Sequence, residues 1–345
     1  MIIKSHTHLK LKTMANLTTN YMGLTLKNPI IASSSGLTGS LKSILALEEA
    51  GVGAIVVKSI FEEEIIADTH DNLNKMHATG FIYPETMEYF DFDEMTDPVS
   101  SYLKLISDAK KQVNVPIIAS INCVTADGWP SFASKAEEAG ADGVELNIFA
   151  LPSDMNRTET ENEKLYFDII SSVAENTKLP IAIKIGSYNS SLARFIKKLS
   201  ETRASAIVLF NRSYNPDFDI YTFDYNASHV LSTSSDLGFS LRWIALMSGR
   251  VSKDLAASTG VHTGEAVVKQ LLAGAKAVQV CSALYRNGLG YVKSMLSVLE
   301  DWMQEMGYKT IDEFRGKMSQ EKSYNPAAFE RVQFMKYFKD RDSDF

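Results

Sequence analysis

Two lysines and three asparagines recur at equivalent points of the sequence, each close to the end of a short apolar run. They are Lys58, Asn122, Asn147, Lys184 and Asn211. A lysine held in such a place can stabilise developing negative charge or form a Schiff base with a carbonyl. Each residue alone could equally cap a strand or satisfy a loop carbonyl. Their recurrence at equivalent positions favours one shared site.

Glycines and small hydroxyl residues follow the last two apolar runs. S-T-G-V-H-T-G begins at Ser258, and C-S-A-L begins at Cys281. Backbone N–H groups in loops of this kind cradle phosphate in α/β barrels, so the pair of loops predicts a phosphate site. We interpret Cys281 as a small residue at a strand end rather than as a nucleophile. His262 is expected to cap the helix that follows it.

The elements that must position these residues are eight short apolar runs separated by helical patterns. Near-continuous apolar runs are typical of parallel strands covered on both faces. The runs are 29–35, 53–59, 115–122, 141–148, 179–186, 204–211, 254–260 and 275–282. Eight such units predict an α/β fold of the (β/α)8 or TIM barrel type, in one domain, with its active face at the carboxyl ends of the strands. A doubly wound sheet is the alternative, but it rarely needs eight strands, and no G-x-G-x-x-G follows the first run.

Composition narrows the class of protein. The 345 residues are 45% hydrophobic and 22% charged, with a net charge of −7, which argues against nucleic acid or an anionic membrane as the main partner. No apolar run reaches the roughly 18 residues of a membrane span. Cys123 and Cys281 provide neither a disulfide framework nor a metal-binding spacing, so we expect no metal and a reducing, cytoplasmic location.

Three segments are expected along the chain. Residues 1–13 precede a second methionine, Met14, and form a polar N-terminal extension that is expected to be poorly ordered. Residues 14–318 hold the barrel. Residues 319–345 form a C-terminal helical tail.

The ordered set of motifs resembles the class 1 dihydroorotate dehydrogenases and the catalytic barrel of dihydropyrimidine dehydrogenase. N-P-I-I-A-S, V-V-K-S, A-S-I-N-C, G-A-D-G-V-E-L-N, A-I-K-I and A-G-A-K-A-V-Q-V-C-S-A-L occur in the family's order between Leu24 and Ser319. L-N-x-x-x-L-P-x-D after strand four and L-F-N-R after strand six are similar to the bacterial subgroup called dihydroorotate dehydrogenase-like proteins. The resemblance implies an FMN-dependent oxidoreductase acting on CH–CH bonds, as in pyrimidine metabolism.

The resemblance also implies a role for each strand-end residue. Ser33, Ser34, Lys58 and Ser59 would lie near the flavin ring, and Lys184 near its N1 and O2 atoms. Asn122 and Asn147 would hydrogen-bond the ring or the substrate, and Asn211 would face the substrate. The phosphate would be held by Thr259, Gly260, Cys281 and Ser282. The residues expected to act in catalysis are Lys58, Asn147, Lys184 and Asn211. A lysine at N1 would stabilise the negative charge that hydride transfer creates there.

The sequence departs from the family after strand four. Dihydroorotate-oxidising relatives carry a Cys or Ser proton acceptor in the pattern E-L-N-x-S-C-P-N, and here that position falls on Ala150 or Leu151. Neither can take a proton, and a general base contributes about 10²–10⁴-fold. Ser153, a weaker catalytic candidate, and Asp154 lie close in sequence and could substitute as the base, but the turn at Pro152 is expected to direct them elsewhere. Dihydroorotate oxidation is therefore predicted to be very slow.

Two further departures concern loops. After strand two the family's N-P-x-P-R pattern is replaced by Phe61-Glu62-Glu63-Glu64-Ile65, which is interpreted as a solvated acidic helix start. The family's G-G-x-S-G flavin loop is replaced by Ser232-Thr233-Ser234-Ser235.

Three function classes remain open on the sequence. The first is an FMN oxidoreductase acting on a small cyclic or conjugated molecule, with a soluble electron acceptor or a partner subunit. The second is a phosphate-binding lyase or aldolase in which Lys58 or Lys184 forms a Schiff base. The third is a flavin-binding protein without catalysis. By analogy with related cytosolic enzymes, a homodimer is expected.

Overall fold

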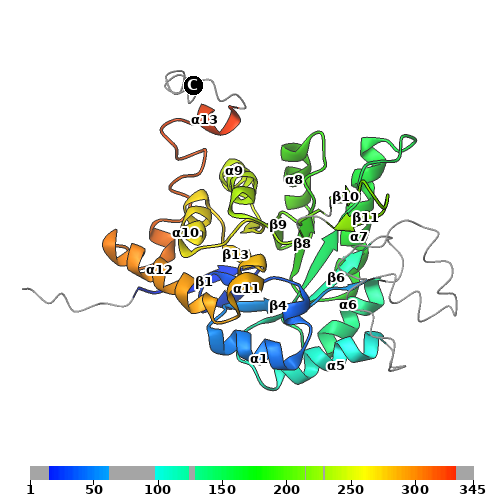
Figure 1. Ribbon diagram of the computed structural model, residues 1–345, viewed down its shortest axis with the longest axis horizontal. Helices are drawn as coiled ribbons and strands as arrows, with labels where there is room; N and C mark the ends of the chain where they lie inside the picture. Colours follow the sequence, from blue (N-terminus) through cyan, green and yellow to red (C-terminus); the bar gives the residue numbers. More distant parts are fainter. Residues whose placement is uncertain (1–14, 62–97, 124–128, 214, 228–229, 332–345) are drawn as a thin grey trace, which may run out of the picture.

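The computed structural model describes residues 15–61, 98–123, 129–213, 215–227 and 230–331, and its centre is a closed barrel of parallel strands (Figure 1). The barrel strands are β3 (Ile30–Ala32), β4 (Ala54–Val56), β6 (Ile117–Cys123), β7 (Gly143–Ile148), β8 (Ile181–Ile185), β9 (Ala206–Leu209), β12 (Asp254–Ala257) and β13 (Ala277–Val280). Each pairs in parallel with its neighbours, and the β4–β6 pairing completes the ring. A short strand, β5 (Ile60–Phe61), also pairs with β6.

The eight strands coincide with the eight apolar runs, so the predicted TIM barrel is confirmed and the doubly wound sheet is wrong. Alternate side chains explain why each run is apolar throughout. Ile55 and Val57 join the core between strands and helices, whereas Ala54 and Val56 join the core inside the barrel. Both faces of each strand are thereby buried, as expected for a parallel sheet inside a ring of helices.

Helices surround the strands (Figure 1). They are α1 (Leu41–Ala50), α5 (Pro98–Lys110), α6 (Trp129–Glu138), α7 (Glu159–Asn176), α8 (Leu192–Ser200), α9 (Leu237–Met247), α10 (Gly264–Ala273), the short α11 (Ser282–Asn287) and α12 (Tyr291–Glu305). Each buries one apolar stripe; α8, for example, buries Leu192, Phe195, Ile196 and Leu199 at the spacing of a helix face. Short 3₁₀ turns are η1 (Gly36–Thr38), η2 (Ser234–Asp236) and η3 (Ile311–Glu313).

Two glycine turns return the chain from a helix to the next strand. Gly51 ends α1 at φ 100°, and Gly274 ends α10 at φ 118°, each with its N–H bonded to the last helical carbonyls. Only glycine adopts this left-handed conformation at little cost. The strands β4 and β13 begin three residues later in both cases.

A hairpin at the start of the chain closes the amino end of the barrel. Strands β1 (Thr19–Tyr21) and β2 (Leu24–Leu26) pair antiparallel, and Tyr21, Met22 and Leu26 pack with the alanines and valines of the barrel interior. The Met22 amide donates a hydrogen bond to Asp254 Oδ2 at 2.8 Å. This hairpin is not predicted by the sequence patterns.

A second hairpin, β10 (Pro216–Phe218) with β11 (Tyr225–Ala227), follows β9 and is exposed. The start of the predicted tail packs against the barrel helices. Ser319 and Gln320 are buried, and the backbone N–H of Gln320 donates to Ala245 O at 2.9 Å. The tail then contains the four-residue α13 (Ala327–Glu330). The expected boundaries at residues 13 and 318 stay predictions, and residues 1–14 and 332–345 lie outside the described residues.

Candidate active site

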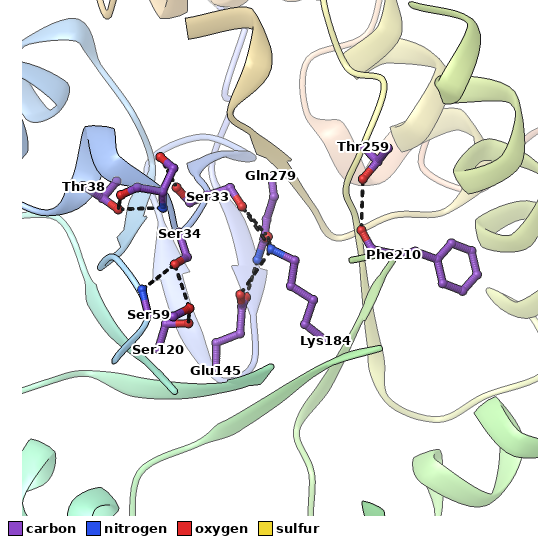
Figure 2. Close-up of polar contacts among 11 residues, drawn as sticks. Ser33, Ser34, Thr38, Ser59, Ser120, Glu145, Lys184, Phe210, Thr259 and Gln279 are labelled. Atoms are coloured by element: carbon purple, nitrogen blue, oxygen red, sulfur yellow. Dashed lines mark hydrogen bonds and ion pairs between the residues drawn. The ribbon is translucent and has the colours of Figure 1, made fainter. Parts of the chain in front are cut away.

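The carboxyl ends of the barrel strands meet at one mouth, and a polar layer lies just beneath it. Lys184 on β8 is 7% exposed in its side chain, and its Nζ donates to Ser33 Oγ and to Gln279 Oε1, both at 3.1 Å. Its third neighbour is Glu145 on β7, whose Oε1 lies 3.6 Å from Nζ and whose side chain is 1% exposed. Gln279 Nε2 donates to Glu145 Oε2 (Figure 2). Four strands therefore contribute to one buried polar cluster.

A chain of hydroxyl groups joins the first two strand ends to β6. Ser34 and Ser59 share a hydrogen bond of 2.9 Å between their hydroxyls, and Ser59 continues to Ser120 at 2.7 Å (Figure 2). The Ser59 amide also donates to Ser34 Oγ, and Tyr102 OH is bonded to both backbone groups of Ser120. Ser33, Ser34 and Ser59, which are predicted to lie near the flavin ring, are thus held in fixed positions before any ligand binds.

Two asparagines at the mouth have unsatisfied side-chain oxygens. Asn122 on β6 and Asn147 on β7 are register partners, and Asn147 in turn pairs with Lys184 on β8. The Oδ1 atoms of both asparagines are buried and accept no hydrogen bond within the described part of the chain. Because buried polar atoms are almost always satisfied, these two oxygens point to a ligand that donates hydrogen bonds.

The remaining two predicted polar residues, Lys58 and Asn211, are half-buried. Lys58 follows β4, and a methyl group at Gly39 would lie 3.3 Å from its Cδ, so the η1 turn packs closely on the lysine stem. Asn211 follows β9, and its amide donates to Ile185 O at 2.8 Å, which ties this strand end to β8.

The predicted phosphate loops come together at β12 and β13. Thr259 and Gly260 both have positive φ, 74° and 80°, and Thr259 Oγ1 donates to Phe210 O at 3.1 Å (Figure 2). A methyl group at Gly260 would lie 2.1 Å from Leu237 N, so only glycine fits this approach to α9. Ser282, which begins α11, accepts a hydrogen bond from the Ser232 amide at 2.9 Å. The loop that replaces the family's glycine-rich segment is therefore part of the same region.

His262 occupies a different place from the one expected. The N-cap of α10 is Thr263, whose side chain accepts from the Ala266 amide, so the predicted capping role of His262 is wrong. The His262 ring is instead hydrogen-bonded through Nε2 to the Ser232 hydroxyl at 3.0 Å. Burial, together with the positive charge of Arg286, lowers the pKa of His262 below 6.5. Arg286 also donates to Ser232 O, which places its guanidinium beside the same loop.

Replacement of His262 by Gln is expected to flatten the pH dependence of stability. Because the folded state lowers the pKa of His262, the unfolded chain binds the proton more readily below the ordinary value of 6.5. The residue therefore lowers the free energy of unfolding as the pH falls below 6.5 and has no such effect above it. Urea denaturation between about pH 7 and pH 5 should show a smaller loss in the variant. An equal loss in both proteins would contradict this assignment.

The segment after β7 carries an aromatic contact where relatives of the family carry a proton acceptor. The Phe149 ring packs over Gly186, where a methyl group would lie 2.5 Å from Cε2. It also meets Tyr188 edge to face, with the ring centroids 6.0 Å apart. Ala150 donates its amide to Tyr166 OH at 3.4 Å, and the Leu151 side chain is 52% exposed. The apolar departure seen in the sequence therefore joins the loops after β7 and β8.

Ser153 and Asp154, the neighbours considered as substitute bases, are both exposed. Asp154 Oδ1 accepts from the Asn156 amide at 2.9 Å, which closes a turn, and the Ser153 amide donates to Leu151 O at 2.8 Å. The acidic residues Glu62, Glu63 and Glu64 lie outside the described residues.

The sequence analysis missed two members of the polar layer, Glu145 and Gln279. A signal was present, because each is a polar residue at an inward-facing position of a largely apolar strand. Glu145 alternates with Val144 and Leu146 and shares parity with Asn147. Reading that parity would have placed both side chains inside the barrel.

Comparison with known proteins gives a family match over most of the chain. A family model described as "Dihydroorotate dehydrogenase" matches residues 16–303. The chain is 25% identical over 314 residues to a Thermoplasma volcanium protein named "Dihydroorotate dehydrogenase B (NAD(+)), catalytic subunit", covering 88% of this chain and 98% of that relative. It is 21% identical to the Arabidopsis thaliana "Dihydropyrimidine dehydrogenase (NADP(+)), chloroplastic", covering 85% and 75% respectively.

A solved structure shares the fold. The crystal structure of DHODH from Eimeria tenella in complex with ferulenol superposes with a TM-score of 0.62 at 16% sequence identity. The match covers 87% of this chain and 88% of that one. Within the residues that the structure describes, no helix combines the length and apolar character needed to cross a membrane.

Proposed function

Because the chain belongs to the dihydroorotate dehydrogenase family, we propose that it is an FMN-dependent oxidoreductase whose cofactor binds at the barrel mouth. The observation that carries the proposal is the pair of buried, unsatisfied oxygens of Asn122 and Asn147 beside Lys184. A flavin ring carries both a donor N–H and several acceptors, so this donor and acceptor set suits it. The close packing of Gly260 against Leu237 fixes the loop after β12, whose backbone N–H groups are proposed to bind the phosphate.

The residues proposed to hold FMN fall into two groups. The ring group contains Ser33, Ser34, Lys58, Ser59, Asn122, Asn147, Lys184 and Asn211, and the phosphate group contains Thr259, Gly260, Cys281 and Ser282. Bound FMN would supply the chemistry that the side chains lack, because it accepts a hydride from a carbon atom and passes the electrons on. Lys184 contributes a cation held by Ser33 and Gln279, so its position requires no rearrangement during the reaction.

The proposed substrate is a small cyclic or conjugated molecule other than dihydroorotate. Ala150 and Leu151 offer no proton acceptor, and the Phe149–Tyr188 contact makes this side of the mouth apolar and aromatic. A substrate that is oxidised here has to lose its proton to another group or to water. These features favour a substrate whose reaction does not depend on a base in the segment after β7.

The lyase alternative receives less support. A Schiff base requires an unprotonated amine that is free to attack a carbonyl. Lys184 Nζ is nearly buried, donates two hydrogen bonds and lies 3.6 Å from a carboxylate. These contacts hold the amine in place and disfavour its attack on a carbonyl.

The proposed electron acceptor is a partner subunit or a soluble molecule. The Thermoplasma volcanium relative is named as a catalytic subunit, which supports the first of these. A homodimer and a cytoplasmic location remain predictions, and size-exclusion chromatography of the purified protein tests the former.

Purified protein is expected to be yellow and to release FMN on denaturation. Absorption spectra should show the two visible flavin bands, and mass spectrometry of the released cofactor should identify FMN. Asn147→Leu is expected to weaken binding, because it removes a buried side-chain oxygen that has no hydrogen-bond partner within the described residues. Asn20→Leu, at an exposed residue of the hairpin at the opposite end of the barrel, is the matched control and should retain the cofactor. A colourless wild type that cannot be reconstituted with FMN would overturn the proposal.

A further inference from the structure

The cation beneath the mouth is accompanied by a carboxylate in direct contact with it. Glu145 Oε1 lies 3.6 Å from Lys184 Nζ, and the two side chains are 1% and 7% exposed. Burial in a low-dielectric interior makes the interaction of such a pair strong and leaves little screening by water. Whichever partner holds the proton, the pair has a net charge of zero.

The groups that hydrogen-bond directly to the pair carry no charge that would offset this neutrality. Lys184 and Glu145 make their other described contacts to neutral groups, the Ser33 hydroxyl and the Gln279 amide. Tyr21 lies in the apolar core inside the amino end of the barrel. Its own burial, with the negative charges of Glu145 and Asp254, raises the pKa of its hydroxyl well above the ordinary value. That hydroxyl is therefore neutral.

Gln279 fixes the position of the Lys184 ammonium along the barrel axis. Its Nε2 donates to Glu145 and its Oε1 accepts from both Lys184 and Ser33, so the amide has one orientation that satisfies all three partners (Figure 2). Lys184 is consequently anchored to β7, β13 and the end of β3. The ammonium cannot move toward the mouth without breaking these contacts.

We infer that Glu145 is a positioning residue that offsets the charge of Lys184 and thereby lowers the reduction potential of the flavin. The inference rests on the proposed function. Two-electron reduction of FMN with uptake of one proton leaves a negative charge on the ring, and a cation nearby stabilises that charge. A carboxylate paired with the cation opposes the stabilisation. The effect does not depend on which oxidant or reductant the protein uses, because the charge of Glu145 changes the equilibrium between oxidised and reduced flavin.

Glu145→Gln is expected to make the potential of the bound flavin more positive. The substitution keeps the shape and removes the negative charge, and we expect the equilibrium constant for reduction to rise at least tenfold, about 30 mV for a two-electron couple. The measurement is anaerobic reduction of the FMN-loaded protein in the presence of a reference dye. Lys184→Met should shift the potential in the opposite direction.

Glu163 offers a matched control. It is a carboxylate of similar burial, 4% exposed, paired with Lys198 between α7 and α8. Glu163→Gln removes the same charge outside the barrel and should leave the flavin potential unchanged. If Glu145→Gln acted only by lowering stability, Glu163→Gln would change the flavin potential in the same way.

The double variant E145Q/K184M keeps the test decisive if the single variants do not fold. It replaces a net-neutral pair by two neutral side chains, a change that buried ion pairs often tolerate. Its potential should lie near that of the wild type. A flavin-loaded E145Q protein with the wild-type potential, or a double variant as shifted as K184M, would overturn the inference while leaving the proposed function intact. A wild type that binds no flavin would overturn both.

Discussion

Anaerobic mixing of the FMN-loaded protein with dihydroorotate is expected to leave the flavin oxidised while family members that have the base reduce theirs. The reaction removes a hydride from one carbon and a proton from its neighbour, and the second step needs a base. Ala150 and Leu151 occupy the segment that supplies it in relatives, and neither side chain accepts a proton. General base catalysis contributes about 10²–10⁴-fold, so the half-reaction should be slower by that order. Stopped-flow absorbance of the flavin measures it directly.

A cysteine introduced into the same segment tests whether the base is all that is missing. Ala150→Cys and Leu151→Cys each offer a thiol at one of the two possible positions, and recovery of flavin reduction in either would show that the rest of the mouth still accepts dihydroorotate. Ser153→Cys is the matched control, because Ser153 is exposed beyond the Leu151 turn. Rapid reduction of the unmodified protein would contradict our interpretation of residues 149–151.

Gly260→Ala is expected to weaken FMN binding strongly. The residue has φ 80°, and the added methyl group would lie 2.1 Å from Leu237 N and 2.6 Å from Asp236 C. Both neighbours are backbone atoms, so the loop after β12 has to move as a whole. The left-handed conformation adds about 1–2 kcal/mol of strain for a residue with a Cβ. If backbone N–H groups of this loop bind the phosphate, a displaced loop loses them together, and we expect affinity to fall by about 100-fold or more.

Gly238→Ala, at the residue that follows Leu237 on α9, is the control for this prediction. No atom lies within 4 Å of a methyl group at Gly238, and alanine is favoured over glycine in a helix. Its FMN affinity should match the wild type, and its thermal midpoint should be equal or slightly higher. Circular dichroism of the flavin-free proteins separates misfolding from lost binding. A folded Gly260→Ala protein with normal FMN affinity would exclude this loop as the phosphate site.

The barrel could be predicted because each of its strands is a short apolar run that is visible in the local sequence. Runs such as 179–186 are apolar on both faces, and the parity of Ala182 and Lys184 against Ile181, Ile183 and Ile185 is visible without a structure. The strand-end residues followed from the same reasoning, since a closed parallel barrel brings its carboxyl ends together. That reasoning locates residues at the mouth without giving their partners.

Contacts between distant segments could not be predicted. Nothing near Phe149 in the sequence indicates that its ring packs over Gly186, because that contact depends on the relative height of two loops. His262 was assigned to its own helix by sequence proximity, whereas its partner, Ser232, lies 30 residues away. Sequence patterns report local periodicity, and the electrostatics of the site arise from pairs that only the closed ring assembles.

The hairpin at the amino end of the barrel has a consequence for the order in which the chain becomes functional. Thr19 and Met22 are bonded to Lys276 and Asp254, more than 230 positions later in the chain. Contacts of such sequence separation form slowly and late. We therefore expect the amino end of the barrel interior to stay open to water during synthesis until β12 and β13 have left the ribosome. Loading of the cofactor should follow completion of the polypeptide, and amide hydrogen exchange should show β1 and β2 becoming protected together with β12 and β13.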